Sequence, residues 1–280
     1  MVNGGGDSQV ELSLKEFKEY LALYYRQRSA ANIEREVLTK LQPYRVDNAI
    51  IMAAGKSTRF SPFSLYKPKA LAQVKGELLI ERQIQQLQAV GIPDIYVVVG
   101  YKKEQFLYLA EKFGVHIVEN DDYDRYNNTA TLMCVRQYLA NSYICSSDNY
   151  FTKNPFEPYV YRPYYAAVYA DGETAEWCLA YDAQERITAV TIGGRDSWYM
   201  LGHAYFDKAF SRTFLQILQN AYKDITVREH LWEDLYRQHL DELVLYIRKY
   251  PADVIYEFDS LAELAAFDPQ STALEAKYYI

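Results

Sequence analysis

Apolar runs and amphipathic segments alternate along the chain from residue 47 onward. The apolar run Asp47–Ala54 stops at a glycine, which is typical of a strand buried on both faces. The pattern then predicts a helix over Ile80–Val90, a strand over Ile95–Val99, a helix over Lys103–Phe113 and a strand over Val115–Val118. Strands and helices in this order predict an α/β protein with a Rossmann-like, doubly wound sheet.

The pattern changes after Asn149 to short, aromatic segments separated by turn residues. These predict strands at Ala166–Tyr169, Trp177–Tyr181 and Ile187–Thr191, followed by helices over Lys208–Ala221 and Val227–His239. We therefore expect a mixed sheet.

Upstream of residue 47, apolar positions at helical spacing predict two short helices between Leu12 and Gln42, with a polar break around Ser29. We accordingly divide the chain into a helical N-terminal extension (residues 1–46), a main domain (47–268) and a C-terminal tail (269–280). Basic residues of the extension are partly offset by Glu34 and Glu36, which favours packing or a homodimer over DNA recognition. The tail is typical of a linker, so fusion to a kinase or transaminase domain in a longer parent protein stays open.

The amino-acid composition of the chain limits the kinds of molecule that we expect it to bind. A net charge of −7 and a pI near 5.3 argue against a nucleic-acid-binding surface, which needs clustered Lys and Arg. The three cysteines have neither metal-ligand spacing nor the density of a disulfide scaffold, and no stretch approaches the roughly 20 apolar residues that span a bilayer. We expect a cytoplasmic protein without a nucleic-acid or membrane partner.

The loop after the first strand carries the strongest chemical signal. It contains three small residues in a row, Ala53, Ala54 and Gly55. Small residues let backbone amides approach phosphate oxygens and a base closely. Arg59 and Lys69 can neutralise a triphosphate and the charge that develops when its α-phosphorus is attacked, and Lys56 is a weaker third candidate. A glycine turn after a strand is common for purely structural reasons, so the argument depends on these cations.

A second apolar segment, Tyr143–Ser147, predicts a strand that ends in Asp148. The carboxylate would lie at the carboxyl edge of the sheet, where open α/β folds bind ligands. Because Mg²⁺ takes a few carboxylate oxygens together with phosphate and water, Asp148 is the first candidate metal ligand. Aspartate at a strand end also often serves only as a turn former.

Two asparagines lie in a loop that enters a helix. The amide side chains of Asn127 and Asn128 can read the donor and acceptor edge of a pyrimidine. For Asn127, capping of the helix is an equally good interpretation.

The loop and the Pro68-Lys69 pair resemble the signature of the sugar-nucleotide type of nucleotidylyltransferase family, and the resemblance is closest to bacterial CTP:phosphocholine cytidylyltransferases. It spans about Asp47 to Asp268. Besides the loop, it rests on Val99-Gly100-Tyr101, Asn120, Tyr126-Asn127-Asn128, Ser147-Asp148-Asn149-Tyr150, Glu176-Trp177 and Leu231-Trp232-Glu233-Asp234.

This resemblance implies a magnesium-dependent reaction between CTP and phosphocholine that gives CDP-choline and pyrophosphate. The acceptor phosphate would attack the α-phosphorus in line, without a covalent enzyme intermediate or a general base. Gly100 and Tyr101 would join the nucleotide site. Glu233 and Asp234 match the family's acidic pair and would supply the further magnesium ligand.

The aromatic side chains Trp177, Tyr199 and Trp232 could enclose the quaternary ammonium of the acceptor, with Glu176 or Asp196 as countercharge. Each ring on its own is more typical of the core, and Trp177 and Trp232 stand out because they match family positions. The same chemistry with 2-aminoethylphosphonate, phosphoethanolamine or a sugar 1-phosphate is the nearest alternative. A catalytically silent nucleotide-sensing module is an alternative of another class.

Overall fold

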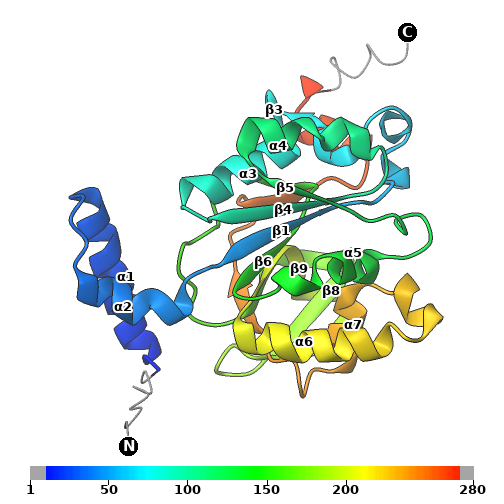
Figure 1. Cartoon of the computed structure of the whole chain (residues 1–280). Helices are drawn as coiled ribbons and strands as arrows, with labels where there is room; N and C mark the ends of the chain where they lie inside the picture. The colour runs from blue at the N-terminus through cyan, green and yellow to red at the C-terminus, as the bar shows by residue number, and fades with distance from the viewer. Residues whose placement is uncertain (1–10, 272–280) are drawn as a thin grey trace, which may run out of the picture. The chain divides into compact units, whose positions relative to one another are not determined.

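The computed structural model describes residues 11–271, which divide into two compact units. One unit holds the described residues up to Arg45 together with Tyr159–Tyr161, and the other begins at Val46 and holds the rest. The boundary lies one residue before the predicted start of the main domain. Figure 1 shows the helices of the first unit and the sheet of the second.

The first unit is a pair of helices, α1 (Leu14–Ser29) and α2 (Arg35–Leu41), as the spacing of apolar residues predicts. A capping box starts α1, because the Ser13 hydroxyl accepts from the Glu16 N–H and the Glu16 carboxylate accepts from the Ser13 N–H. The unit has its own aromatic core, formed by Leu12, Phe17, Tyr24, Val37, Leu41, Tyr44 and Tyr159.

The second unit is built on a seven-stranded mixed sheet with the strand order β10-β8-β9-β6-β1-β4-β5. Its strands are β1 (Asn48–Ala53), β4 (Asp94–Val99), β5 (His116–Glu119), β6 (Ser142–Ser146), β8 (Tyr164–Tyr181), β9 (Ile187–Phe206) and β10 (Tyr246–Lys249). Two small antiparallel pairs accompany it, β2 (Gln73–Val74) with β3 (Glu77–Leu78) and β7 (Asn149–Phe151) with β11 (Ile255–Glu257).

Strand β1 lies at the centre of this sheet, parallel to both β4 and β6. Its side chains Ala49, Ile50 and Ile51 are fully buried, which is the reason for the unbroken apolar run in the sequence. Because the three strands are parallel, their carboxyl ends meet at one edge, and the loops that follow them lie together there.

Helices cover both faces of the sheet. Figure 1 shows α3 (Leu79–Ala89) and α4 (Tyr108–Phe113) on one face, and α5 (Asn128–Cys134), α6 (Lys208–Ala221) and α7 (Trp232–Gln238) on the other. A last helix, α8 (Leu261–Phe267), follows β11. No helix in residues 11–271 is long and apolar enough to cross a membrane.

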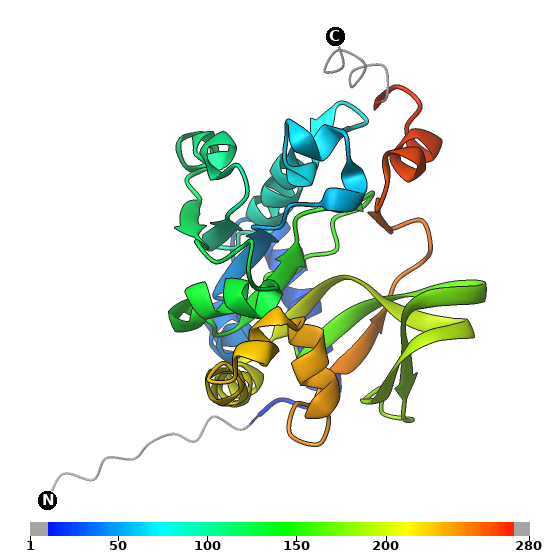
Figure 2. The same cartoon turned by 90° about the vertical axis from the view of Figure 1, so that its right-hand side faces the viewer.

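Strands β8 and β9 form a hairpin of 18- and 20-residue strands, where the sequence predicted three short strands. Figure 2 shows the two strands running side by side away from the helices. Register shifts interrupt the ladder between Ala170 and Glu173 and again near Cys178, which pairs with both Thr191 and Tyr199. Such irregularities break the alternation of polar and apolar residues, so the pattern predicted separate short strands where the structure has two long ones.

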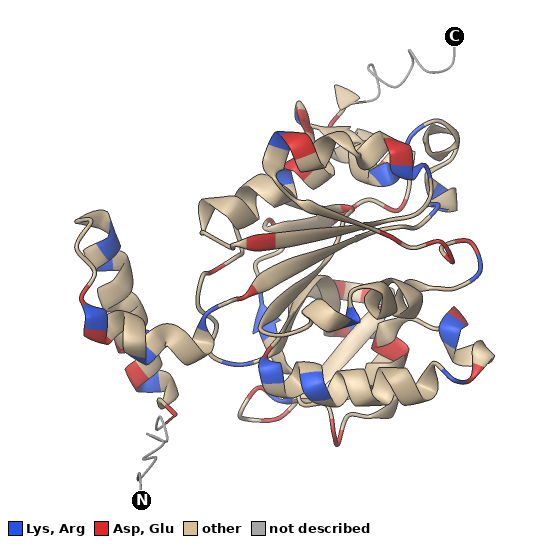
Figure 3. Ribbon diagram, viewed as in Figure 1, with Lys and Arg blue, Asp and Glu red and all other residues tan. Residues whose placement is uncertain are grey.

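Charged side chains are distributed over both units, with Lys and Arg interspersed among Asp and Glu along the described ribbon (Figure 3).

Candidate active site

A pocket of about 590 Å³ opens at the carboxyl edge of the parallel strands. The loop after β1 forms one wall, and Asp148, after β6, forms another. The predicted residues Ala53, Ala54, Gly55, Lys56, Lys69, Asn127, Asn128 and Asp148 all line it. The fold therefore brings together most of the nucleotide-site residues that the sequence predicts.

Gly55 and Gly100 have different roles in the loops around this pocket. A Cβ atom on Gly55 would meet no atom of the described residues within 4 Å, so the glycine leaves open space on the pocket side. A Cβ atom on Gly100 would lie 2.5 Å from the Tyr123 Cβ and 2.9 Å from the Ala54 carbonyl oxygen. Gly100 is therefore required by the close approach of Tyr123, which itself lines the pocket.

Tyr101, also predicted for the nucleotide site, supports the loop from behind. Its N–H donates to the Ala54 carbonyl at 3.0 Å, and its hydroxyl donates to the Ser64 carbonyl at 2.8 Å. Neither Gly100 nor Tyr101 lines the pocket, so the structure gives both a supporting position.

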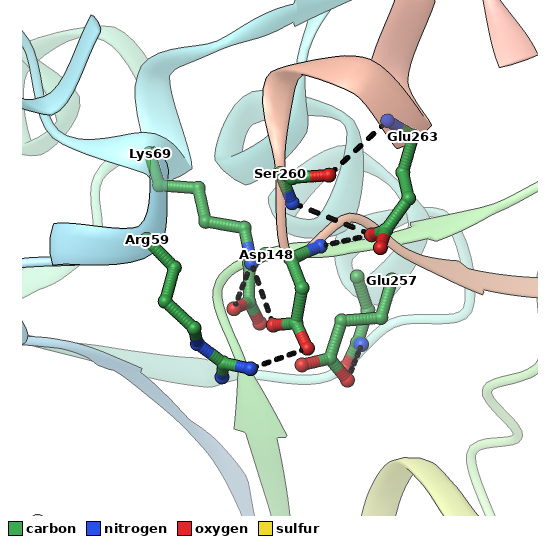
Figure 4. A network of polar contacts seen from close by, with 8 residues as sticks. Arg59, Lys69, Asp148, Glu257, Ser260 and Glu263 are labelled. Carbon is green, nitrogen blue, oxygen red and sulfur yellow. Dashed lines mark hydrogen bonds and ion pairs between the residues drawn. The ribbon is translucent and has the colours of Figure 1, made fainter. Parts of the chain in front are cut away.

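An ion-pair network lies at the mouth of the pocket (Figure 4). The Lys69 ammonium is 2.9 Å from Asp148 Oδ2 and 3.9 Å from Asp259 Oδ1, and Arg59 Nη1 is 2.7 Å from Asp259 Oδ2. Lys69 is only 5% exposed, whereas the Arg59 side chain is 76% exposed. The Lys69 side chain is therefore held in place by its surroundings. Arg59 pairs with Asp259 from the protein surface, and both residues line a small pocket of about 250 Å³.

Only one of the two carboxylate oxygens of Asp148 has a partner among the described residues. Its Oδ1 is buried and has no hydrogen-bond partner among the described residues, while Oδ2 accepts from Lys69. A buried carboxylate oxygen without a partner is unfavourable unless a ligand or a metal completes it.

Two acids that the sequence interpretation missed lie next to Asp148. Glu257 accepts a 3.3 Å hydrogen bond from Asn149 Nδ2, and repulsion by Asp148, followed by burial, raises the pKa of its carboxyl to about 8. Asp259 is two residues further along. Glu257 is the last residue of β11 and Asp259 follows it, and β11 pairs with β7 directly after Asp148. An available signal was the alternation of acids with apolar residues from Ile255 to Asp259, before the capping box of α8.

The predicted metal ligands Glu233 and Asp234 have other partners. Asp234 accepts a hydrogen bond from the Leu231 N–H at the start of α7 and pairs with Arg237. Glu233 is partly buried, and its removal from water raises the pKa of its carboxyl to about 7. The structure does not join either acid to Asp148, and it holds Glu257 and Asp259 there instead. Within the described residues, no three His, Cys, Asp or Glu side chains converge closely enough to hold a metal unaided.

A further pocket of about 390 Å³ lies beside Asp259, and tyrosines and acids form much of its lining. They are Tyr169, Glu176, Tyr199, Tyr256, Glu257, Asp259 and Glu263. Burial, followed by the nearby Asp259, raises the pKa of the Glu176 carboxyl, and burial raises the pKa of the Tyr199 hydroxyl. Two of the four predicted acceptor residues, Glu176 and Tyr199, are thus found together in one pocket.

The other two, Trp177 and Trp232, are absent from its lining. Trp232 is 1% exposed and stacks on Tyr165 in the core, with ring centroids 5.6 Å apart. Trp177 packs against the same core, and the Arg237 guanidinium lies 5.6 Å from its ring. The structure thus separates the three predicted rings: Tyr199 lines this pocket and the two tryptophans pack elsewhere. Consecutive strand residues point to opposite faces, so the strand that places Glu176 in the pocket turns Trp177 away from it.

Comparison with known proteins agrees with this geometry. The sequence profile of the MobA-like NTP transferase domain matches residues 49–231. The choline-phosphate cytidylyltransferase of Streptococcus pneumoniae is 37% identical over 77% of this chain and 94% of its own length. A 2-aminoethylphosphonate cytidylyltransferase of Lancefieldella rimae is 37% identical over 79% of this chain and 92% of its own length.

A solved structure shows the same relationship in three dimensions. The CTP:phosphocholine cytidylyltransferase of S. pneumoniae superposes with a TM-score of 0.78 at 36% identity, covering 81% of this chain and 99% of that one. The resemblance inferred from the loop and strand motifs is therefore confirmed. The profile match, the identities and the superposition together make this chain a nucleotidyltransferase that belongs to the MobA-like NTP transferase family.

Proposed function

We propose that the protein transfers a cytidylyl group from CTP to phosphocholine and releases pyrophosphate. The observation that carries this proposal is the position of the Lys69–Asp148–Asp259 group, which borders both the 590 Å³ pocket and the 390 Å³ pocket. The acceptor phosphate must reach the α-phosphorus of the nucleotide, so the two substrates need adjoining pockets. The names of the two relatives above support the choice of nucleotide and the class of acceptor.

The larger pocket suits the nucleotide. Its loop offers backbone amides at Ala54–Lys56 without bulky side chains, and Lys69 supplies a buried positive charge at one end. Phosphoryl-type transfer depends mainly on positioning and on stabilisation of charge. We assign this role to Lys69 and Arg59, and the open space over Gly55 allows close approach of the triphosphate.

The acidic group fits a divalent cation. Asp148 Oδ1 is buried and has no hydrogen-bond partner within residues 11–271, Glu257 is repelled by Asp148, and Lys69 pairs with oxygens of Asp148 and Asp259. Carboxylate oxygens of this kind suit Mg²⁺. We propose that Asp148 and Asp259 would hold the ion, in place of the predicted Glu233 and Asp234. When bound, Mg²⁺ supplies positive charge that offsets the charge of the phosphates.

The smaller pocket suits a cationic acceptor. The rings of Tyr169, Tyr199 and Tyr256 offer faces to a quaternary ammonium, which needs no hydrogen bonds. Glu176 supplies countercharge, as the sequence predicted, and Glu263 adds to it. At neutral pH the acceptor phosphate is already ionised, so its oxygen can attack without a general base.

A second acceptor, 2-aminoethylphosphonate, is favoured by the number of acids in the same pocket. Glu176, Glu257, Asp259 and Glu263 exceed what a single quaternary ammonium requires, and a primary ammonium can donate hydrogen bonds to carboxylates. The sugar 1-phosphate alternative has less support, because sugar hydroxyls can donate hydrogen bonds to carboxylates but carry no positive charge to offset four of them. Membership of an enzyme family likewise disfavours the silent sensing module.

The test is pyrophosphate release by the full chain with Mg²⁺ and CTP, comparing phosphocholine, phosphoethanolamine, 2-aminoethylphosphonate and glucose 1-phosphate. We expect phosphocholine to have the highest kcat/KM, and Asp148→Asn to abolish release with every acceptor. Preference for 2-aminoethylphosphonate would retain the nucleotide half of the proposal and replace the acceptor. Absence of release with all four would contradict it.

A further inference from the structure

A seam of hydrogen bonds joins the first turn of α5 to the segment Arg228–Glu233. The Asn127 N–H donates to the Arg228 carbonyl at 2.8 Å, and the Thr129 hydroxyl lies 3.2 Å and 3.1 Å from the carbonyls of Arg228 and His230. Residues from both sides of the seam, Asn127 and Asn128 on one and Glu229 on the other, line the nucleotide pocket. The seam therefore fixes two walls of one pocket relative to each other.

The side-chain amide of Asn128 completes this seam. The Trp232 N–H lies 2.7 Å from Asn128 Oδ1, and because a backbone N–H can only donate, it determines which end of the amide is oxygen. The Asn128 NH₂ group then faces Glu233 and donates to its Oε2 at 3.2 Å. Both ends of the amide make a hydrogen bond within the protein, so the orientation of this side chain in the pocket wall is fixed.

Glu233 anchors the far end of the seam. Its second oxygen accepts a 3.1 Å hydrogen bond from the Tyr165 hydroxyl on β8, and Tyr165 is itself held by stacking on Trp232. Within the described residues Glu233 has no ion-pair partner, and the one charged group that affects its pKa, Asp234, is another acid. Partial removal of a carboxylate from water without a cation opposite it costs free energy, so packing alone does not account for its place here.

We propose that Glu233 is a positioning residue that holds the Asn128 amide, and through it the first turn of α5, in the arrangement that binds the nucleotide. In the part of the chain that the structure describes, the hydrogen bonds of its side chain go to Asn128 and Tyr165 and not to Lys69 or Asp148, so it acts on binding rather than on the transfer step. The inference rests on the proposed function for its kinetic assay, although direct measurement of CTP binding tests it independently.

The test compares Glu233→Leu, which removes both acceptor oxygens, with Glu233→Gln, which keeps one oxygen for Asn128. Asn128→Ala and the double variant Asn128→Ala/Glu233→Leu complete a cycle that measures the coupling. Asp207→Asn, an acid-to-amide change at the cap of α6, is the matched control. Each full-length variant is assayed with Mg²⁺ for the KM of CTP, the KM of phosphocholine, kcat, the CTP dissociation constant by calorimetry, and the melting temperature.

We expect Glu233→Leu to raise the KM and dissociation constant of CTP about tenfold, the order expected for loss of a hydrogen bond to a charged group. The KM of phosphocholine and kcat should change less than about twofold. The melting temperature should fall, because the Tyr165 hydroxyl and the Asn128 amide lose their acceptor. Glu233→Gln should weaken CTP binding less. In the Asn128→Ala background, Glu233→Leu should add nothing further.

Unchanged CTP binding in Glu233→Leu would overturn the inference. So would additive effects in the double variant, or equal losses for both substrates, which would indicate a purely structural role. Wild-type protein that binds CTP without turnover would contradict the proposed function alone, and the dissociation constants would still decide the role of Glu233. Wild-type protein that does not bind CTP would overturn both.

Discussion

Lys69 Nζ lies 2.9 Å from Asp148 Oδ2, although the two residues are 79 positions apart in the chain. Lys69 lies on the short turn η4 (Lys69–Leu71), whereas Asp148 follows the central strand β6, so the contact closes the nucleotide pocket at one end. The same ammonium faces Asp259 from the C-terminal segment. One buried cation thus connects the three chain segments that carry the proposed chemistry.

Asp148→Asn should abolish transfer while leaving the fold intact. The amide keeps the shape of the side chain but removes the charge opposite Lys69 and the unpartnered oxygen that we assign to the metal. We expect kcat/KM to fall by at least about 10³-fold, as for removal of a principal electrostatic group. Pyrophosphate release and circular dichroism measure the two effects, and a variant that retains a tenth of the activity would contradict the assignment.

Gly55→Ala and Gly100→Ala should distinguish a glycine that leaves space for the ligand from a glycine that permits close packing. A methyl group on Gly55 meets no atom of the described residues, so stability should hold while the KM of CTP rises. A methyl group on Gly100 collides with Tyr123 and the Ala54 carbonyl, so overpacking should cost about 1–3 kcal/mol of unfolding free energy. Urea unfolding and CTP kinetics on both variants check this, and equal behaviour of the pair would count against it.

Tyr199→Ala and Trp232→Ala should show which aromatic residues face the acceptor. Loss of the Tyr199 ring should raise the KM of phosphocholine with little change in melting temperature, because the ring lines the 390 Å³ pocket. Loss of the buried Trp232 ring should instead destabilise the protein by about 3–5 kcal/mol. A Trp232→Ala variant that stays stable but has a raised KM for phosphocholine would show instead that the Trp232 ring contacts the acceptor.

The stability of Glu233→Gln relative to the wild type should increase with pH. Burial raises the pKa of Glu233 in the folded state to about 7 from 4.5, so the folded protein holds this proton more tightly than the unfolded chain. The wild type therefore loses stability as pH rises from about 4.5 to about 7, by roughly 3 kcal/mol in total, and glutamine does not titrate. Urea unfolding of both proteins at pH 5 and pH 8 measures the difference. A constant difference would show that Glu233 is ionised at both pH values.

The spacing of apolar residues was sufficient to predict the helices and strands that bury one well-defined face. The helix over Lys208–Ala221 coincides with the observed α6, and the central strands and the two N-terminal helices lie where their apolar spacing places them. The glycine-containing loop and Asp148 were also predictable, because parallel strands bring their carboxyl ends to one edge whatever the details of packing. The pattern did not predict the short strand β10, nor did it single out α8.

The sequence by itself determined the fold class and which loop, cation and acid lie at the carboxyl edge of the sheet, since each follows from residues close together in the chain or from the geometry of a parallel sheet. Only the tertiary structure decided which acids accompany Asp148 and which rings line the 390 Å³ pocket. Glu257 and Asp259 reach the site because β11 pairs with β7, and such pairing depends on contacts over about a hundred residues of chain. Trp232 matched the pattern of a binding residue, yet burial against Tyr165 and Phe206 places its ring in the core, because a large apolar surface is stabilised most where water is excluded.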